Sequence, residues 1–317
     1  MTTIDEIKKC LSNTFGTDIV ETASVGGSGT FGFDTKNGLG FPEALSCVPS
    51  NTVVETFSGL TTPFGYLRVV KILRIGDIPI VRVPYHGWTL PWPKAENILA
   101  DFWLLSNLGV RQVLADASVG GMNGAAPWDI IIPDDIVPGD INRALATSLS
   151  EELAKEAWVR MNKPFCERIR TILIKQAEIL KEYGTEEPHH KLGNIIKAGT
   201  DYTTQLGPFE SAPEIRMIAR MVPEVIAVNQ SSGLESFCAR VCGMCYSVLH
   251  IVANYAEGLE NAEWNPEPGG MNEFYRQCPL PMSVILWRTL KEIVTCDTAF
   301  PCSCQSTACE LELTQFS

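Results

Sequence analysis

Segments with strand-like and helix-like patterns alternate along almost the whole 317-residue chain. β-branched and apolar runs predict strands at 19–25, 52–57, 67–75, 78–83, 110–117, 129–132, 199–206, 225–228 and 246–252. Helical spacing of apolar residues predicts helices at 3–15, 94–108, 151–160, 163–183, 212–221, 234–242 and 281–295. This order predicts an α/β fold, in which helices cover both faces of a sheet.

The composition limits the classes of partner. With 45% apolar and 20% charged residues the chain is globular, and its net charge of −12 argues against nucleic acid or an anionic membrane surface as a partner. No apolar run is long enough to span a membrane, and the amphipathic N-terminus lacks the apolar core of a signal peptide. Eleven cysteines, many within apolar segments, favour free thiols in a reducing cytoplasm.

The motif Cys302-Ser303-Cys304 stands apart near the C-terminus. A zinc site would require a second pair of ligands at metal-binding spacing, and no histidine follows His250. The sequence therefore predicts no metal ligands. It leaves open whether the two cysteines remain thiols or form a strained disulfide.

Glycine-rich or polar loops follow most of the predicted strands, at 26–32, 85–88, 118–123, 207–211, 229–235 and 254–257. Open α/β sheets bind ligands where such strand ends meet. No single loop is specific, because the chain has no Walker lysine and no complete dinucleotide-binding glycine motif. The convergence of the loops predicts a small-molecule site.

The segment 199–214 is the most informative of these connections. A strand breaks at Gly207-Pro208, and a helix then begins at Ser211, with Pro213 in the first turn and Glu214 as the capping-box partner. Polar side chains in this turn lie at the carboxyl end of a strand.

The order of the segments resembles the nucleoside phosphorylase family, in particular its trimeric branch of purine nucleoside and methylthioadenosine phosphorylases. The resembling residues run in order from about 20 to 310: Gly27-Ser28-Gly29, Thr62-Pro63-Phe64-Gly65, His86-Gly87, Gly120-Gly121-Met122-Asn123, Pro164-Phe165-Cys166, Gly199-Thr200, Gly207-Pro208-Phe209-Glu210-Ser211, Glu214, Ser231 to Glu235, Asn254-Tyr255-Ala256 and Cys302-Ser303-Cys304.

The resemblance implies a three-layer phosphorylase-type fold with a mixed, distorted central sheet flanked by helices. It implies one domain over 1–317, with an N-terminal helix in 1–18 and insertions at 33–50 and 260–272, and a homotrimer in the cytoplasm. The implied reaction is attack of phosphate on C1′ of a purine nucleoside, which gives free base and pentose 1-phosphate. Phosphate is then a co-substrate and no cofactor is needed.

Carried over residue by residue, the resemblance assigns phosphate binding to Ser28, His86 and Ser118. Glu210 and Asn254 match the pair that reads a 6-oxopurine: a carboxylate accepts from N1–H, and an amide donates to O6 or N7. These two residues and His86 are the catalytic candidates. The remaining substrate contacts fall on Phe209, Gln230 and Ser231.

Four departures affect the phosphate and ribose contacts. Tyr85 stands where the family has a phosphate-binding arginine, Thr89-Leu90-Pro91 replace a second histidine, Gly207-Pro208-Phe209 is one residue short, and Gln230 replaces a ribose-contacting methionine. A tyrosine cannot replace a bidentate arginine, and Arg82 could compensate only if the loop is rebuilt.

These departures leave two alternatives to phosphorolysis. The first is an enzyme that uses water or another acceptor in place of phosphate. The second is a non-catalytic nucleoside-binding protein on the same fold.

Overall fold

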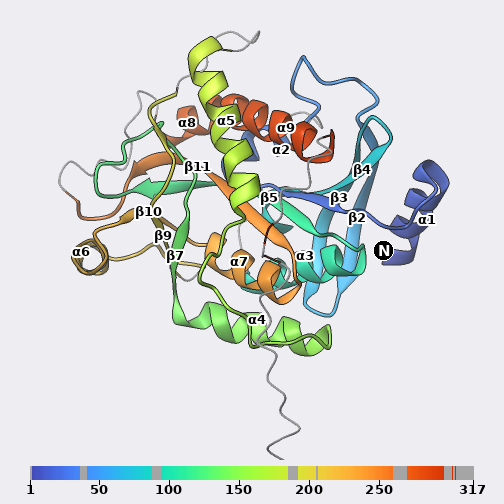
Figure 1. The fold of residues 1–317 in the computed structure, drawn as a ribbon, viewed down its shortest axis with the longest axis horizontal. Coiled ribbons are helices and arrows are strands. Elements are labelled where there is room, and N and C mark those ends of the chain that lie inside the picture. Colours follow the sequence, from blue (N-terminus) through green and yellow to red (C-terminus); the bar gives the residue numbers. More distant parts are fainter. Residues whose placement is uncertain are drawn as a thin grey trace, which may run out of the picture.

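The computed structural model describes residues 2–35, 41–87, 94–184, 192–204, 206–259 and 270–295, together with Cys302 and Cys304. Its strands join one mixed 11-stranded sheet between two groups of helices (Figure 1). The strands are β1 (Thr22–Val25), β2 (Val53–Thr62), β3 (Gly65–Ile75), β4 (Ile78–Val83), β5 (Gln112–Gly121), β6 (Ile130–Ile131), β7 (Asp135–Pro138), β8 (Ile195–Ile196), β9 (Thr200–Thr203), β10 (Val225–Asn229) and β11 (Cys245–Tyr255). The helices are α1 (Ile4–Phe15), α2 (Phe31–Thr35), α3 (Ala95–Asn107), α4 (Asp140–Glu152), α5 (Glu167–Tyr183), α6 (Ala212–Met221), α7 (Ser232–Val241), α8 (Met271–Gln277) and α9 (Pro279–Thr295), with a 3₁₀ turn η1 (Pro84–Gly87).

The sheet branches at β5. Its main path runs β2-β3-β4-β1-β5-β10-β9-β7, while β11 pairs with β5 and with β6, and β6 pairs with β8. The first half of β5 is parallel to β1, and its last two residues are antiparallel to β10. Along its whole length β5 is also parallel to β11. The sheet is therefore mixed and distorted and lies between helices, which confirms the predicted fold class.

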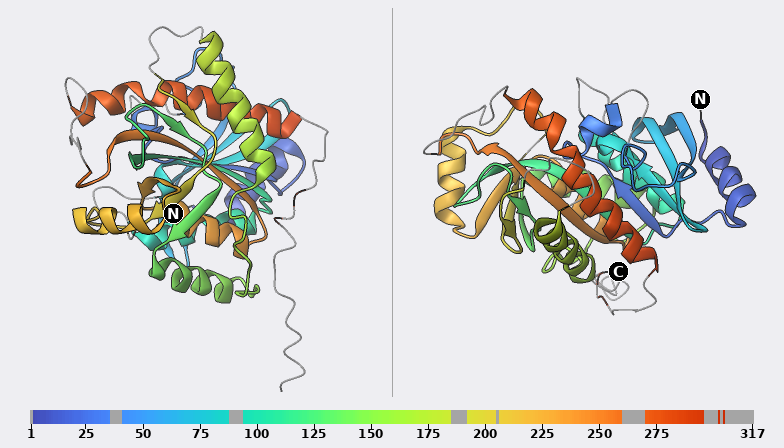
Figure 2. Two further views of the ribbon diagram at one scale, coloured as in Figure 1. Left: turned by 60° about the vertical axis from the view of Figure 1, so that its left-hand side comes forward. Right: turned by 90° about the horizontal axis from the view of Figure 1, so that it is seen from above.

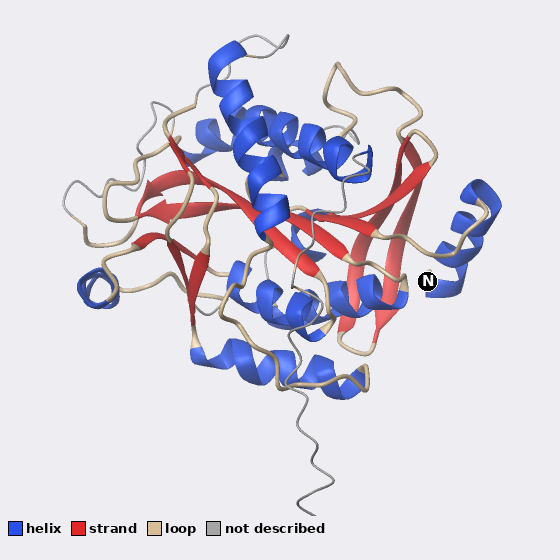
Figure 3. Ribbon diagram, in the orientation of Figure 1, coloured by secondary structure: helices blue, strands red, loops and turns tan. Residues whose placement is uncertain are grey.

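Two helical groups cover the sheet (Figure 3). On one side α5 and α9 pack together and against β11. On the other side α3 and α7 pack against each other and the sheet, with α4 outside them. Helices α1 and α6 lie at opposite ends of the molecule (Figure 2). Most of the apolar core lies between the sheet and these two layers.

Local capping signals fix two helix starts. Thr3 and Glu6 form a capping box at α1. Ser211 and Glu214 form the capping box predicted at α6, and the Glu214 carboxylate accepts a 3.3 Å hydrogen bond from the Ser211 N–H. Such a box satisfies two amide groups that the first helical turn leaves without partners. Among the described residues no helix is long and apolar enough to cross a membrane.

Three predicted boundaries are wrong. Asn254 and Tyr255, expected in a loop, are the last residues of β11. The helix expected at 151–160 is instead α4, which begins after Gly139 and ends at Glu152; Ala154 then takes a left-handed φ of 50° and Trp158 is 67% exposed. The small residues at 118–121 do not form a loop but belong to β5. Packing explains this last difference, because a Cβ at Gly120 would lie 3.0 Å from Val228 and 3.2 Å from Ala256.

The segments predicted as insertions are described only in part. Residues 36–40 and 260–269 lie outside the described residues. Within 33–50, Phe41 and Leu45 are buried, and the Phe41 ring lies 6.4 Å from that of Trp287. These two side chains belong to the core beside α9.

Candidate active site

A cavity of about 400 Å³ opens at one edge of the sheet. Every residue proposed from the sequence as a site residue lines it. These are Ser28, His86, Ser118, Phe209, Glu210, Gln230, Ser231 and Asn254. The other lining residues are Tyr85, Ala117, Val119, Gly120, Gly207, Val228, Asn229, Ala253, Met271 and Tyr275.

Strand direction explains this convergence. β4, β1, β5 and β11 are successive parallel neighbours, so their carboxyl ends lie at the same edge of the sheet. The chain segments after β4 and β1 supply His86 and Ser28. Ser118 and Asn254 lie within β5 and β11, near the carboxyl ends of these strands. Asn254 is opposite Gly120, two residues beyond Ser118. The strand spacing and rise place the backbones of Ser118 and Asn254 about 8 Å apart.

Three hydroxyl groups that line the cavity lie close together. The Ser28 Oγ lies 2.6 Å from the Ser118 Oγ and accepts a 2.9 Å hydrogen bond from the Ser118 N–H. The Tyr275 hydroxyl lies 2.9 Å from the same Ser118 Oγ. Burial raises the pKa of Tyr275 to about 12, so this phenol remains neutral and can donate a hydrogen bond. The cluster offers hydroxyl donors to an anion.

His86 is held beside these hydroxyls by a buried carboxylate. Its Nδ1 hydrogen-bonds the Glu235 Oε1, and the second Glu235 oxygen accepts a 2.5 Å hydrogen bond from the Tyr246 hydroxyl. Both Glu235 and Tyr246 are buried. Since a hydrogen bond at one imidazole nitrogen fixes the ring, this contact holds the orientation of the His86 side chain in the cavity wall.

The backbone that carries His86 is strained. Tyr85 and His86 take left-handed φ values of 51° and 50°, a conformation that costs L residues about 1 to 2 kcal/mol each. The His86 N–H donates to the Gly26 carbonyl at 2.7 Å, which ties this turn to the glycine loop after β1. Strain of this kind, held by surrounding contacts, is common where side chains must be aimed at a ligand.

The glycine loop is packed closely against β5. A Cβ at Gly27 would lie 1.8 Å from the Asp116 carbonyl oxygen and 2.7 Å from the His86 Nε2, so only glycine fits. Thr30 then donates from its N–H and hydroxyl to the buried Asp116 carboxylate, each at 3.0 Å. This packing fixes the loop that presents Ser28.

Arg82 does not replace the missing phosphate arginine. It is fully buried and donates to the Ser24 Oγ at 2.7 Å and to the Thr30 Oγ1 at 2.9 Å, with its guanidinium 4.3 Å from the centre of the Phe41 ring. It supports the glycine loop from behind and is not among the lining residues. His86 is the only described lining residue that can carry a positive charge.

Glu210 and Asn254, the pair assigned to the base, also line the cavity. Burial raises the pKa of Glu210, and the nearby negative charges of Glu214 and Glu257 raise it further, while backbone hydrogen bonds lower it. The Asn254 amide donates a 2.9 Å hydrogen bond to the Tyr255 carbonyl beside a bulge in β11. Both side chains are only partly buried.

Phe209 and Gln230 frame the mouth of the cavity. The Phe209 side chain is 65% exposed, although it lines the cavity. The Gln230 amide donates to the carbonyls of Gly207 and Pro208, both at 3.3 Å, and accepts from the Gly207 N–H at 3.4 Å. Gln230 therefore braces the shortened Gly207-Pro208-Phe209 turn, a role that the sequence did not suggest.

Ser231 is the buried N-cap residue of α7. Its N–H and that of Ser232 donate to the Asn229 Oδ1 at 2.9 and 3.0 Å. The Asn229 amide in turn donates to both oxygens of the buried Asp201, at 2.5 Å each. This network fixes the turn between β10 and α7, on which Gln230 and Ser231 are presented.

Several residues of the site were not predicted. Tyr275 and Met271 come from α8, which follows a Pro/Gly-rich stretch that gave no signal for the site. Glu235 lay in a resembling motif but had no assigned role, and its contact with His86 joins residues 149 positions apart. Tyr85 was noted for what it replaces, and the structure places it in the cavity wall.

Comparison with known proteins agrees with this geometry. Residues 52–275, more than half of the chain, match the family model described as the phosphorylase superfamily. The chain belongs to the phosphorylase superfamily. The resemblance read from the motifs is thus confirmed.

Individual superfamily members similar to this chain include two archaeal proteins. A 6-oxopurine nucleoside phosphorylase of Pyrococcus furiosus is 30% identical over 245 residues, which cover 75% of this chain and 80% of that protein. A probable S-methyl-5′-thioinosine phosphorylase of Methanopyrus kandleri is 31% identical over 205 residues, 63% of this chain and 72% of that protein.

Solved structures of the superfamily share the fold. A methylthioadenosine phosphorylase from an Antarctic soil metagenomic library superposes with a TM-score of 0.69 at 16% identity, covering 92% of each chain. The apo methylthioadenosine phosphorylase of Schistosoma mansoni gives a TM-score of 0.65 at 21% identity, covering 88% of this chain and 92% of that one. At these identities the likeness concerns the fold alone.

Proposed function

We propose that this superfamily member is a pentosyltransferase that cleaves purine nucleosides by phosphorolysis, with a preference for 6-oxopurine bases. The observation that carries the proposal is that one cavity is lined by Glu210 and Asn254 and also by the hydroxyl cluster and His86. The similar archaeal proteins carry names of phosphorylases that act on 6-oxopurine substrates, which supports the same reaction. Nothing in the comparisons supports a hydrolase or a non-catalytic binder.

Recognition of the base falls to Glu210 and Asn254. An ionised Glu210 accepts a hydrogen bond from purine N1–H, and the Asn254 amide donates to O6 or N7. As the glycosidic bond breaks, negative charge develops on the purine, so an amide donor at O6 or N7 binds the transition state more tightly than the substrate. Phe209, at the mouth, offers an aromatic face to the base or sugar.

Phosphate binding falls to Ser28, Ser118 and His86, with Tyr275 as an additional donor. Hydroxyl groups and a charged imidazole can bind the oxygen atoms of phosphate and hold the nucleophile against C1′. The separation of about 8 Å between the Ser118 and Asn254 backbones leaves room for the ribose between phosphate and base. Gln230 and Ser231, on the turn between β10 and α7, also line the cavity. No cofactor takes part in this scheme.

The assembly we propose is a homotrimer in the cytoplasm. Phe209 is a large apolar side chain that stays mostly exposed beside the cavity, and a neighbouring subunit would cover it. The strands from Thr22 to Tyr255 enter one sheet, which supports a single catalytic domain in each chain. Light scattering coupled to gel filtration tests the trimer, and a monomeric mass contradicts it.

Base release tests the reaction directly. Inosine, guanosine, adenosine, methylthioadenosine and S-methyl-5′-thioinosine are each incubated with and without phosphate, and the products are separated by chromatography. Release from the 6-oxopurine nucleosides only with phosphate supports the proposal, and release without phosphate, or none from any nucleoside, contradicts it. Glu210→Gln or Asn254→Ala should then lower kcat/KM at least about tenfold, as expected for a group engaged in the transition state.

A further inference from the structure

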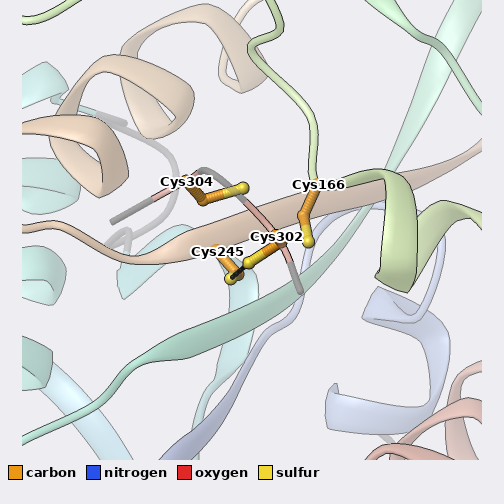
Figure 4. A group of neighbouring side chains, drawn as sticks. All are labelled: Cys166, Cys245, Cys302 and Cys304. Carbon is orange, nitrogen blue, oxygen red and sulfur yellow. Dashed lines mark hydrogen bonds between the residues drawn. The ribbon is translucent and has the colours of Figure 1, made fainter. Parts of the chain in front are cut away.

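Four cysteine side chains that are far apart in the sequence meet at the other end of β11 (Figure 4). They are Cys166, Cys245, Cys302 and Cys304, and their sulfur atoms all lie within 4.8 Å of one another. Cys166 is the N-cap residue of α5, Cys245 is the first residue of β11, and the last two come from the C-terminal segment. We call this group the four-cysteine cluster.

The sulfur geometry fits a tetrahedral metal centre. In a zinc site with four thiolates each Zn–S bond is about 2.3 Å, so the sulfur atoms lie about 3.8 Å apart. A group with every S···S distance at or below 4.8 Å is close to that size. The sulfur atoms of Cys245 and Cys302 are 3.2 Å apart, too far for a disulfide bond of about 2.05 Å.

The surroundings make this a closed, structural type of site. Cys166, Cys245 and Cys304 are buried and Cys302 is partly buried. Four sulfur ligands with no histidine or carboxylate among them favour Zn²⁺ and leave no position for a substrate.

Backbone contacts and charge support the same assignment. The Cys166 N–H donates to the Tyr246 carbonyl at 2.7 Å, and the Cys245 N–H to the Arg111 carbonyl at 2.8 Å, so two ligand positions are fixed by the fold. Cys166 lies at the positive end of the α5 dipole, which stabilises a thiolate. The buried Arg240 donates to the Cys304 carbonyl at 3.5 Å and places a positive charge beside the cluster.

We propose that the four-cysteine cluster binds one Zn²⁺ ion as a structural site that ties the C-terminal segment to β11 and α5. The sequence argument against a metal required a second ligand pair near Cys302-Ser303-Cys304; the fold supplies it from Cys166 and Cys245. Cys245 and Asn254 are nine residues apart on β11, or about 30 Å, so the ion takes no part in nucleoside chemistry.

Metal content of the intact chain is the first test. The protein is purified with a thiol reductant and without chelator, and zinc is measured by inductively coupled plasma mass spectrometry. About one zinc per chain is expected. Less than about one tenth of an equivalent, or two disulfide bonds within the cluster under these reducing conditions, overturns the proposal.

Variants then locate the ion. Cys245→Ser and Cys304→Ser should each lose the zinc, while Cys47→Ser, which changes an exposed cysteine outside the cluster, should keep it. Full zinc content in both cluster variants places the ion elsewhere and contradicts the assignment. If the cluster variants fail to fold, Co²⁺ exchanged into the unmodified protein gives the answer. Tetrahedral thiolate coordination produces intense visible and near-ultraviolet absorption bands, and their absence counts against the site.

Stability supplies an independent readout. Because zinc binds the folded chain, free Zn²⁺ at about a thousand times its Kd should shift the unfolding equilibrium about a thousandfold toward the folded state. Removing the ion with a chelator should lower the Tm in the unmodified and Cys47→Ser proteins. An unchanged Tm in protein shown to have lost its zinc contradicts a structural role.

Discussion

The carboxylate of Glu235 hydrogen-bonds the Nδ1 of His86 from the first turn of α7, although 149 residues separate the two in the chain. This buried contact fixes the only described lining residue that can be positively charged. It places a carboxylate directly against the imidazole ring. In the proposed reaction, phosphate binding would therefore depend on Glu235, which is not among the residues that line the cavity.

Glu235→Gln should raise the KM for phosphate about tenfold, because the neutral amide removes the carboxylate charge from the imidazole ring that binds the anion in the proposed reaction. The KM for the nucleoside should change little. Steady-state kinetics with each substrate varied in turn measure both. Tyr246→Phe is the matched control: it removes the other partner of Glu235, leaves the carboxylate on His86, and should keep the phosphate KM near normal. Equal changes in both variants would refute the charge argument.

Tyr85→Arg should lower the KM for phosphate by about tenfold or more, because a charged hydrogen bond contributes about 1.5 to 3 kcal/mol. Tyr85 already lines the cavity next to His86, so a guanidinium there can reach the same anion. Tyr85→Phe, which removes only the hydroxyl, should give no such gain. Phosphate titration of initial rates is the measurement, and an unchanged KM in the arginine variant places the anion away from this turn.

Some features of the fold and the site could be predicted from the sequence, and others depend on packing between distant segments. The Ser211–Glu214 capping box depends on contacts within one helical turn, and it was predicted correctly. Ser28, His86 and Ser118 follow or end parallel strands, so strand order alone brings them to one edge. Tyr275 and Glu235 reach the site through helices whose packing has no local signal.

The small residues at the end of β5 predict a loop, but the structure places them in the strand. Gly120 and Gly121 suggested a loop, but they are small because other segments of the same chain approach them closely: a Cβ at Gly121 would lie 2.4 Å from the Ala125 carbonyl oxygen. Likewise the four-cysteine cluster has no regular ligand spacing. It exists only once α5, β11 and the C-terminal segment are packed together.

The fall of kcat/KM at acid pH should reflect protonation of the Glu210 carboxylate. Its pKa is raised above the ordinary value of about 4.3, chiefly by burial. The carboxylate must be ionised to accept from N1–H, so kcat/KM for inosine should fall as the pH drops through the raised pKa. Glu210→Gln should remove this fall. Glu257→Gln, which removes a nearby negative charge, should move it to lower pH, and a fall that moves to higher pH would contradict the assignment.

Asp101 should make stability depend on pH. It is fully buried, neither oxygen has a hydrogen-bond partner among the described residues, and burial and the Glu235 charge raise its pKa well above the usual value. Above pH about 3.9 the unfolded chain releases this proton while the folded chain keeps it, so the free energy of unfolding falls by up to about 1.4 kcal/mol per pH unit until the folded pKa is reached.

Asp101→Asn removes this ionisable carboxyl group, so the free energy of unfolding should fall less steeply as the pH rises. Urea unfolding of both proteins between about pH 5 and about pH 7 measures the difference. The variant should gain stability relative to the unmodified chain as the pH rises. A difference that stays constant over this range would show that Asp101 ionises normally in the folded protein.

The identity of the nucleophile is the most direct test of the whole account. Inosine is converted in water enriched in oxygen-18 with unlabelled phosphate present, and the sugar product is identified by mass spectrometry and phosphorus NMR. Ribose 1-phosphate without the heavy isotope, in amounts equal to hypoxanthine, is the predicted result. Free ribose in amounts equal to hypoxanthine, with no ribose 1-phosphate, would mean that water attacks C1′, and the cavity around Ser28, His86 and Ser118 would then not be a phosphate site.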